Sequence, residues 1–155
     1  MPDDYFRDHS PFGATFLVEI DGHNAGQFRE VSGLEINIEF DEIMEGGQNG
    51  YVHKLPGRMT WPNIVLSRGV TQSDLLVAWA QETSGEAFAS SGNKLRRATV
   101  AITMTSSQGK RLRTWEVEGA FPIRWTGPQF SSDSNDQLVE ELEIAHHGFK
   151  VEQLW

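Results

Sequence analysis

The clearest strand signal in the chain is Leu34-Glu35-Ile36-Asn37-Ile38-Glu39-Phe40-Asp41. Apolar and polar residues exchange places at every step, and successive side chains of a β-strand point to opposite faces. The stretch therefore predicts a strand with one buried face and one face that meets water or a polar partner.

Further strand-like segments lie on both sides of this one and are separated by turn residues. They cover residues 15–21, 27–32, 62–68, 98–105, 112–118 and 120–125. Gln108-Gly109 predicts a hairpin turn between two of them, and Gly119 predicts a bulge. Residues 137–147 also alternate and are interpreted as a strand, although Leu, Glu and Ala favour a helix as well.

One helix is expected, over residues 71–84. Thr71 followed by Asp74 is a capping-box pattern, and Gly85 is a natural stop. Leu75, Leu76 and Trp79 form an apolar stripe at helical spacing.

Between the central strand and this helix, residues 41–61 follow no period. A structureless connection of this length is uncommon in a compact domain. Its apolar residues do not suit a disordered linker; they are Ile43, Met44, Tyr51, Val52, Leu55, Met59 and Trp61. The segment is interpreted as an extended loop or hairpin that buries these side chains against something else.

These elements predict a mainly β protein. The expected architecture is a β-sandwich or partly closed barrel of two packed antiparallel sheets, with one flanking α-helix and a long extended loop. The 155 residues suffice for one domain, 1–155, with an irregular N-terminal arm over residues 1–13.

Composition excludes several classes of function. The chain has 13 basic and 22 acidic residues, a net charge of −9, which disfavours specific nucleic-acid binding. It has no cysteine, so disulfides and thiolate metal sites are excluded. The longest apolar run, residues 75–80, is too short for a membrane span, and the acidic start at residues 1–4 does not resemble a targeting segment.

No catalytic constellation is present, and we expect neither an enzyme nor a cofactor. His146 and His147 would point to opposite faces of a strand, so no metal site is expected there. The carboxylates of Glu35, Glu39 and Asp41 are interpreted as a polar strand face, solvated or paired with a neighbouring subunit. Aromatic residues are enriched in protein contacts, which makes Trp61 and Trp155 interface candidates. Physical reasoning alone thus leads to an acidic β protein that self-assembles.

Five stretches, in order along nearly the whole chain, resemble the tail-tube family of contractile phage tails and contractile injection systems. They are Phe28-Arg29-Glu30-Val31-Ser32-Gly33-Leu34; Glu45-Gly46-Gly47-Gln48-Asn49 with Lys54-Leu55-Pro56-Gly57-Arg58; Ile64-Val65-Leu66-Ser67-Arg68-Gly69 with Thr71; Ala120-Phe121-Pro122-Ile123-Arg124-Trp125-Thr126-Gly127-Pro128; and Val139-Glu140-Glu141-Leu142-Glu143-Ile144-Ala145-His146-His147-Gly148.

The resemblance implies a structural inner-tube subunit. Such subunits form hexameric rings by pairing sheet edges, and the rings stack into a rigid hollow conduit that sheath contraction drives through a target envelope. It implies the chain itself, a sheath protein and baseplate or spike proteins as partners, possible cargo in the lumen, and assembly in the bacterial cytoplasm as part of a virion or tail-like particle.

On this interpretation residues 41–61 are the arm that reaches an adjacent subunit or ring. The expected inter-subunit residues are Ile43, Met44, Tyr51, Leu55, Arg58, Met59, Trp61 and Trp155. Replacement of Met59 or Trp61 is expected to impair stacking more than folding. A polar face, lining the lumen or touching a neighbour, is expected to carry Glu35, Glu39, Asp41, Glu141 and Glu143.

Two alternatives remain open at this point. One is a baseplate-proximal paralogue that initiates the tube. The other is a secreted ring protein of the type VI kind that carries or chaperones effectors.

Overall fold

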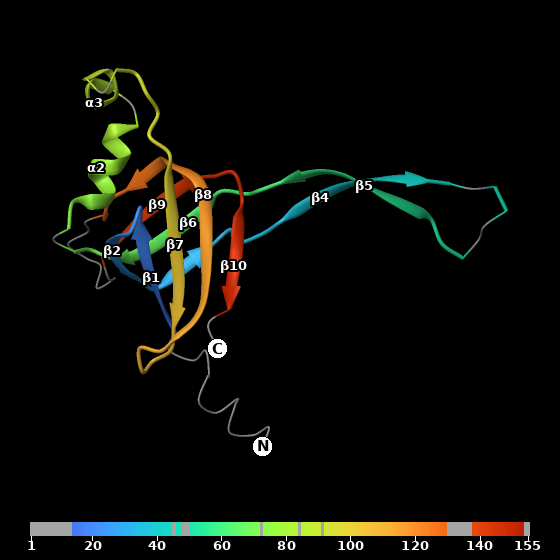
Figure 1. Ribbon diagram of the computed structural model, residues 1–155, viewed down its shortest axis with the longest axis horizontal. Coiled ribbons are helices and arrows are strands. Elements are labelled where there is room, and N and C mark those ends of the chain that lie inside the picture. Colours follow the sequence, from blue (N-terminus) through green and yellow to red (C-terminus); the bar gives the residue numbers. More distant parts are fainter. Residues whose placement is uncertain are drawn as a thin grey trace.

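The computed structural model describes residues 14–44, 46–47, 50–71, 73–83, 85–90, 92–129 and 138–153 (Figure 1). Its elements are β1 (Thr15–Ile20), β2 (His23–Phe28), β3 (Glu30–Ser32), β4 (Asn37–Ile43), β5 (His53–Thr60), β6 (Ile64–Gly69), α2 (Leu75–Glu82), α3 (Gly85–Ser90), β7 (Ala98–Thr105), β8 (Arg111–Thr126), β9 (Val139–Ala145) and β10 (Phe149–Gln153). The expected N-terminal arm and Trp155 lie outside the described residues.

Two antiparallel sheets share the long strand β8, which confirms the predicted fold class. The first sheet runs β2-β1-β7-β8, with β10 on the other side of β8. The second runs β8-β9-β6-β3. The strand passes from one sheet to the other near Gly119, whose φ of +62° suits glycine, as the predicted bulge requires.

The core lies between the two sheets. Alternate residues of the first sheet, among them Val18, Ile102 and Val117, are fully buried against Leu66 and Ile144 of the second. Helix α2 closes one end of the sandwich, where Leu76 and Trp79 join the same apolar cluster. Burial of each large aliphatic side chain contributes about 1.5–3 kcal/mol.

Helix α2 is shorter than predicted. It begins at Leu75, and within the described residues the N-cap Asp74 makes no side-chain capping hydrogen bond. Thr71 Oγ1 instead accepts a hydrogen bond from the Ser73 backbone N–H at 3.3 Å, so the predicted capping box is not formed. The short helix α3 follows after Thr83 and was not predicted.

The central strand differs most from its prediction. It begins at Asn37, and every residue of β4 is exposed, whereas burial of one face was expected. In the described part of the chain β4 pairs with β5 alone, and the two strands project from the body as a hairpin (Figure 1). Residues 139–145 form a strand rather than a helix, and the final strand β10 was not predicted.

None of the described helices has the length and apolar character that a membrane crossing requires.

Candidate assembly surface: the projecting hairpin and the sheet edges

One face of the β4–β5 hairpin is apolar in the half that lies nearer the body. The antiparallel register places Ile38 opposite Met59 and Phe40 opposite Pro56. Because paired residues share a face, these four side chains lie together. Ile38, Phe40 and Met59 are 51%, 53% and 50% exposed.

A bulge and a cation–π contact fix this register. Glu39 lies opposite the extra residue of β5, and a Cβ on Gly57 would come within 3.3 Å of the Glu39 carbonyl oxygen. Lys54 Nζ lies 4.9 Å from the Phe40 ring centroid. The lysine therefore covers part of the ring and leaves the rest of the apolar face open.

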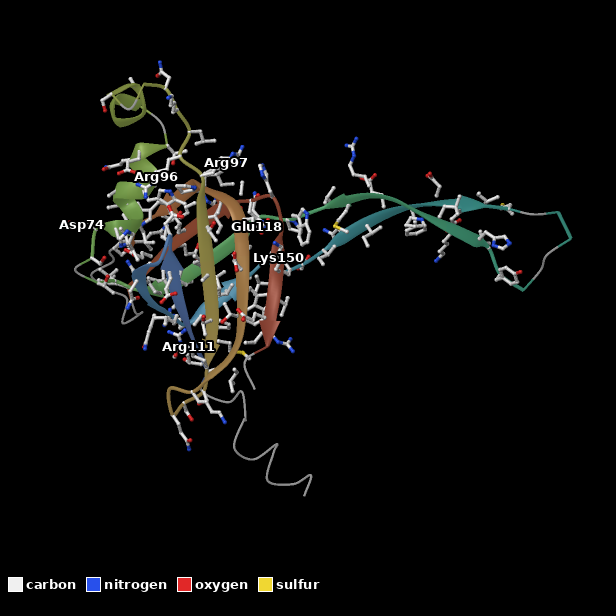
Figure 2. The ribbon with its side chains drawn as sticks, viewed as in Figure 1. Asp74, Arg96, Arg97, Arg111, Glu118 and Lys150 are labelled. Carbon is white, nitrogen blue, oxygen red and sulfur yellow. The ribbon has the colours of Figure 1, made fainter. Side chains whose placement is uncertain are left out.

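The opposite face changes character along its length. Near the body it carries Asn37 and Thr60, which are polar. Towards the tip it carries Leu55, across from Asp41, and Ile43, across from His53. Tyr51 packs edge-on against His53 with ring centroids 5.0 Å apart. Towards the tip the first face carries Glu42 opposite Lys54, so apolar side chains there lie mainly on the second face; side chains project from both sides of the hairpin in Figure 2.

This arrangement needs another surface. A two-stranded hairpin is marginally stable in water, and this one exposes Ile38, Phe40 and Met59 on one face and Ile43 and Leu55 on the other. Exposed apolar patches on soluble proteins mark interaction sites. The hairpin is therefore the strongest candidate for a contact between subunits.

The sheet edges are a second candidate. In the described part of the chain, β2, β3 and β10 each pair on one side only. At the β10 edge Lys150 Nζ lies 2.8 Å from Glu118 Oε1, and this hydrogen bond, with the carboxylate charge, raises the pKa of Lys150 (Figure 2). Both side chains are exposed, so the pair adds little stability, but it places charge beside an edge that could otherwise pair freely.

Most of the predicted inter-subunit residues lie on the hairpin and are exposed: Ile43, Met44, Tyr51, Leu55, Arg58 and Met59. Trp61 lies differently, because its ring packs in the body against Phe149, at 5.0 Å between centroids. Sequence reasoning missed Ile38 and Phe40, because their alternation was taken as evidence of a buried face within the same chain.

The predicted polar face is divided between two places. Glu39 and Asp41 lie on the hairpin, and Glu35 lies in the segment that leads into it. Glu141 and Glu143 lie on the outer face of the second sheet, where Arg124 Nε is 3.5 Å from Glu143 Oε2. The five carboxylates therefore do not form one surface in a single subunit.

The described residues offer little for small-molecule chemistry. Among them no group of three or more His, Asp or Glu side chains could hold a metal ion. A pocket between α2 and the β1–β2 turn, lined in part by Ile20, Trp79 and Arg96, measures about 80 Å³. Ligand sites typically measure about 300–1,000 Å³.

A β-sandwich that carries a projecting apolar hairpin is a fold suited to assembly. The chain belongs to the T4-like virus tail tube protein gp19 family, whose model matches residues 13–150. It is a structural tube subunit, and the family is one of tube proteins rather than of enzymes. No curated protein matches the chain.

Several solved structures are similar. A chain of the PVC sheath–tube complex, an extracellular contractile injection system in its extended state, is 28% identical with a TM-score of 0.72, over 90% of this chain and 88% of that one. A chain of the PVC sheath/tube terminator is 29% identical with a TM-score of 0.71, over 88% of this chain and 92% of that one. Hcp1 from Flavobacterium johnsoniae, 14% identical with a TM-score of 0.52 over 90% and 95%, shares the fold.

Proposed function

We propose that this chain forms hexameric rings that stack into the hollow inner tube of a contractile injection particle or phage tail. The observation that carries the proposal is the hairpin, which exposes apolar side chains on both faces within a family of tube proteins. Sheath contraction would drive the tube through a target envelope, so the subunit's role is mechanical.

Two kinds of contact would build the tube. The edges of the first sheet, β2 and β10, would pair between neighbours around a ring. Such a head-to-tail contact forms a closed ring when the rotation between neighbouring subunits divides a full turn evenly, and a closed ring has no unpaired sheet edges. The hairpin would reach an adjacent subunit or ring, and its exposed apolar side chains would be covered there.

The two outer faces of the sandwich suggest which one lines the lumen. On the first sheet, Thr103 and Thr114 lie together with Oγ1 atoms 3.0 Å apart, and Thr15 and Thr105 with theirs 2.9 Å apart. Charged residues share this face, because the register aligns Glu19, Glu116 and Lys150 in one row across the sheet. Pairing of β2 and β10 between neighbours would join the first sheets into one continuous surface around the ring, so we assign this face to the lumen, which leaves Glu141 and Glu143 facing outward.

Partners follow from the relatives. Structures of a sheath–tube complex and of a baseplate contain chains similar to this one, which supports a sheath protein and baseplate or spike proteins as partners. On this proposal the subunit belongs to a virion or injection particle and is assembled in the bacterial cytoplasm. Cargo in the lumen would be a further partner.

Met59→Asp tests the hairpin's role, and Thr60→Asp is its matched control. The two residues are adjacent in β5 and exposed, but they lie on opposite faces, one apolar and one polar. Burial of an unpaired charge costs several kcal/mol, so Met59→Asp is expected to raise the concentration needed for stacking more than about tenfold. Thr60→Asp should assemble like the unmodified chain, and both subunits should stay folded.

Tube length measured by electron microscopy separates the possible results. Normal-length tubes from folded Met59→Asp subunits would contradict the proposed role of the hairpin. Stable rings that never stack, from the unmodified chain, would favour a ring carrier or a tube initiator instead.

A further inference from the structure

The edge strand β2 contains a β-bulge. Gly26 lies opposite Val18 and Asn24 lies opposite Glu19, so Ala25 is the extra residue between them. A bulged residue drops out of the ladder, and its buried polar groups need other partners. Ala25 is 3% exposed, so water cannot readily satisfy its carbonyl group.

Arg68 of the second sheet supplies the partner. Its Nη1 donates a hydrogen bond to the Ala25 carbonyl oxygen, and its Nε donates to Glu140 Oε1 at 2.7 Å. The guanidinium carbon lies 4.9 Å from the centroid of the Phe28 ring, at the end of β2. A single side chain that is 2% exposed therefore connects β6 and β9 to the edge strand of the other sheet.

Gly26 makes room for this contact. Its φ is +108°, and a Cβ built on it would lie 2.9 Å from Arg68 Nη1. Gly22, in the same β1–β2 hairpin, also has a positive φ, of +79°, but a Cβ there would meet nothing within 4 Å. The backbone of the bulge and the guanidinium are thus fitted to one another.

Stability alone does not account for a charged pair at this position. Desolvation of a buried ion pair offsets most of its attraction, and well-packed apolar residues are often at least as stabilising. Within the described residues, Arg68 Nη2 is buried without a hydrogen-bond partner, a further cost. What the pair supplies, and apolar residues would not, is a directed bond to the Ala25 carbonyl.

We propose that Arg68 and Glu140 are positioning residues for assembly: they hold the β2 bulge, and through it the twist of the edge that the next subunit's strand meets. Bulges set the local bend and twist of edge strands, which decides whether a neighbouring strand can pair. The inference rests on the proposed function, because the pairing strand belongs to a second copy of this chain.

The double variant Arg68→Met/Glu140→Leu tests the proposal. Removal of both charges leaves no unpaired ion in the core, so the subunit should fold. Amide exchange at residues 24–27 should rise about tenfold, the factor for the loss of one hydrogen bond, while amides of β7 and β8 should be unchanged. Ring and tube formation should be lost at concentrations where the unmodified chain assembles.

Gly26→Ala tests the contact between Arg68 and the β2 bulge by changing the bulge instead of the arginine, and Gly22→Ala is its matched control. Gly26→Ala should displace the guanidinium and reproduce the assembly defect, whereas Gly22→Ala strains only its own turn and should assemble normally. This pair decides the matter if the double variant does not fold.

Unchanged exchange in β2, or normal rings from the folded double variant, would overturn the proposal while leaving the proposed function intact. Equal behaviour of the two glycine variants would also overturn it. Failure of the unmodified chain to assemble would overturn the proposed function, and this inference with it.

Discussion

Trp61 lies at the root of the hairpin, where β5 leads into β6. Its ring contacts Phe149, and a Cβ on Gly148 would come within 2.8 Å of it. His146 lies beside this cluster, with its Nε2 2.9 Å from the Pro62 carbonyl oxygen and its Nδ1 accepting from the Gly148 N–H. These contacts join the hairpin root to the segment between β9 and β10.

Trp61→Ala is therefore expected to destabilise the subunit itself, by about 2–3 kcal/mol, because a partly buried aromatic ring is lost. Urea unfolding followed by circular dichroism measures the change. Tyr51→Ala is the control, since Tyr51 lies exposed near the hairpin tip and should leave unfolding unaltered. Equal stability of the two variants would contradict the placement of Trp61 in the body.

Two adjacent leucines of α2 give a sharper comparison. Leu76 is 0% exposed and joins the core, whereas Leu75 is 37% exposed. Leu76→Ala should cost about 3 kcal/mol, and Leu75→Ala less than about 1 kcal/mol. Thermal unfolding of both variants tests whether α2 closes the sandwich, and similar melting temperatures would show that it does not.

At the scale of elements, periodicity predicted strands well where they were long and bounded by turn residues. The β7–β8 hairpin and the bulge at Gly119 followed from Gln108-Gly109 and from the alternation on either side. Strand β10 was missed because residues 149–153 are few and include Lys150 and Glu152, and its pairing with β8 depends on distant residues. Propensity alone did not decide between helix and strand for residues 137–147. The structure shows a strand there because β9 pairs with β6 on one side and β8 on the other.

The alternation of residues 34–41 predicted a strand but could not reveal what covers it. A period of two says that one face avoids water, and the covering surface can belong to the same chain or to another. The same limit applies to the candidate site. The apolar residues of segment 41–61 were identified from sequence. Their division between the two faces of the hairpin depends on the register between β4 and β5.

The hairpin should be dispensable for folding. None of the hairpin residues that the structure describes belongs to the buried core cluster, and Asn37 pairs directly with Thr60, so a short linker can replace residues 37–60. Because paired residues are only about 5 Å apart, a linker of about two to four residues spans the gap. The shortened chain should melt within a few degrees of the original and remain in small species by mass photometry. Loss of cooperative unfolding would instead make the hairpin part of the folding unit.

At the scale of the whole molecule, the structure separates stability from assembly. A sandwich core and α2 hold the subunit together, while the hairpin and the edges of the first sheet leave unsatisfied surface. The chain has no cysteine, so disulfides cannot link the subunits, and apolar burial between them would have to stabilise the assembly. A tube that transmits force needs this arrangement, because every subunit is then fixed by several neighbours.

Negative-stain electron microscopy of the purified protein, with mass photometry over a range of concentrations, tests whether this chain assembles with itself into a tube. We expect hexameric rings and hollow tubes whose length increases with concentration. A monodisperse monomer at every concentration would contradict it.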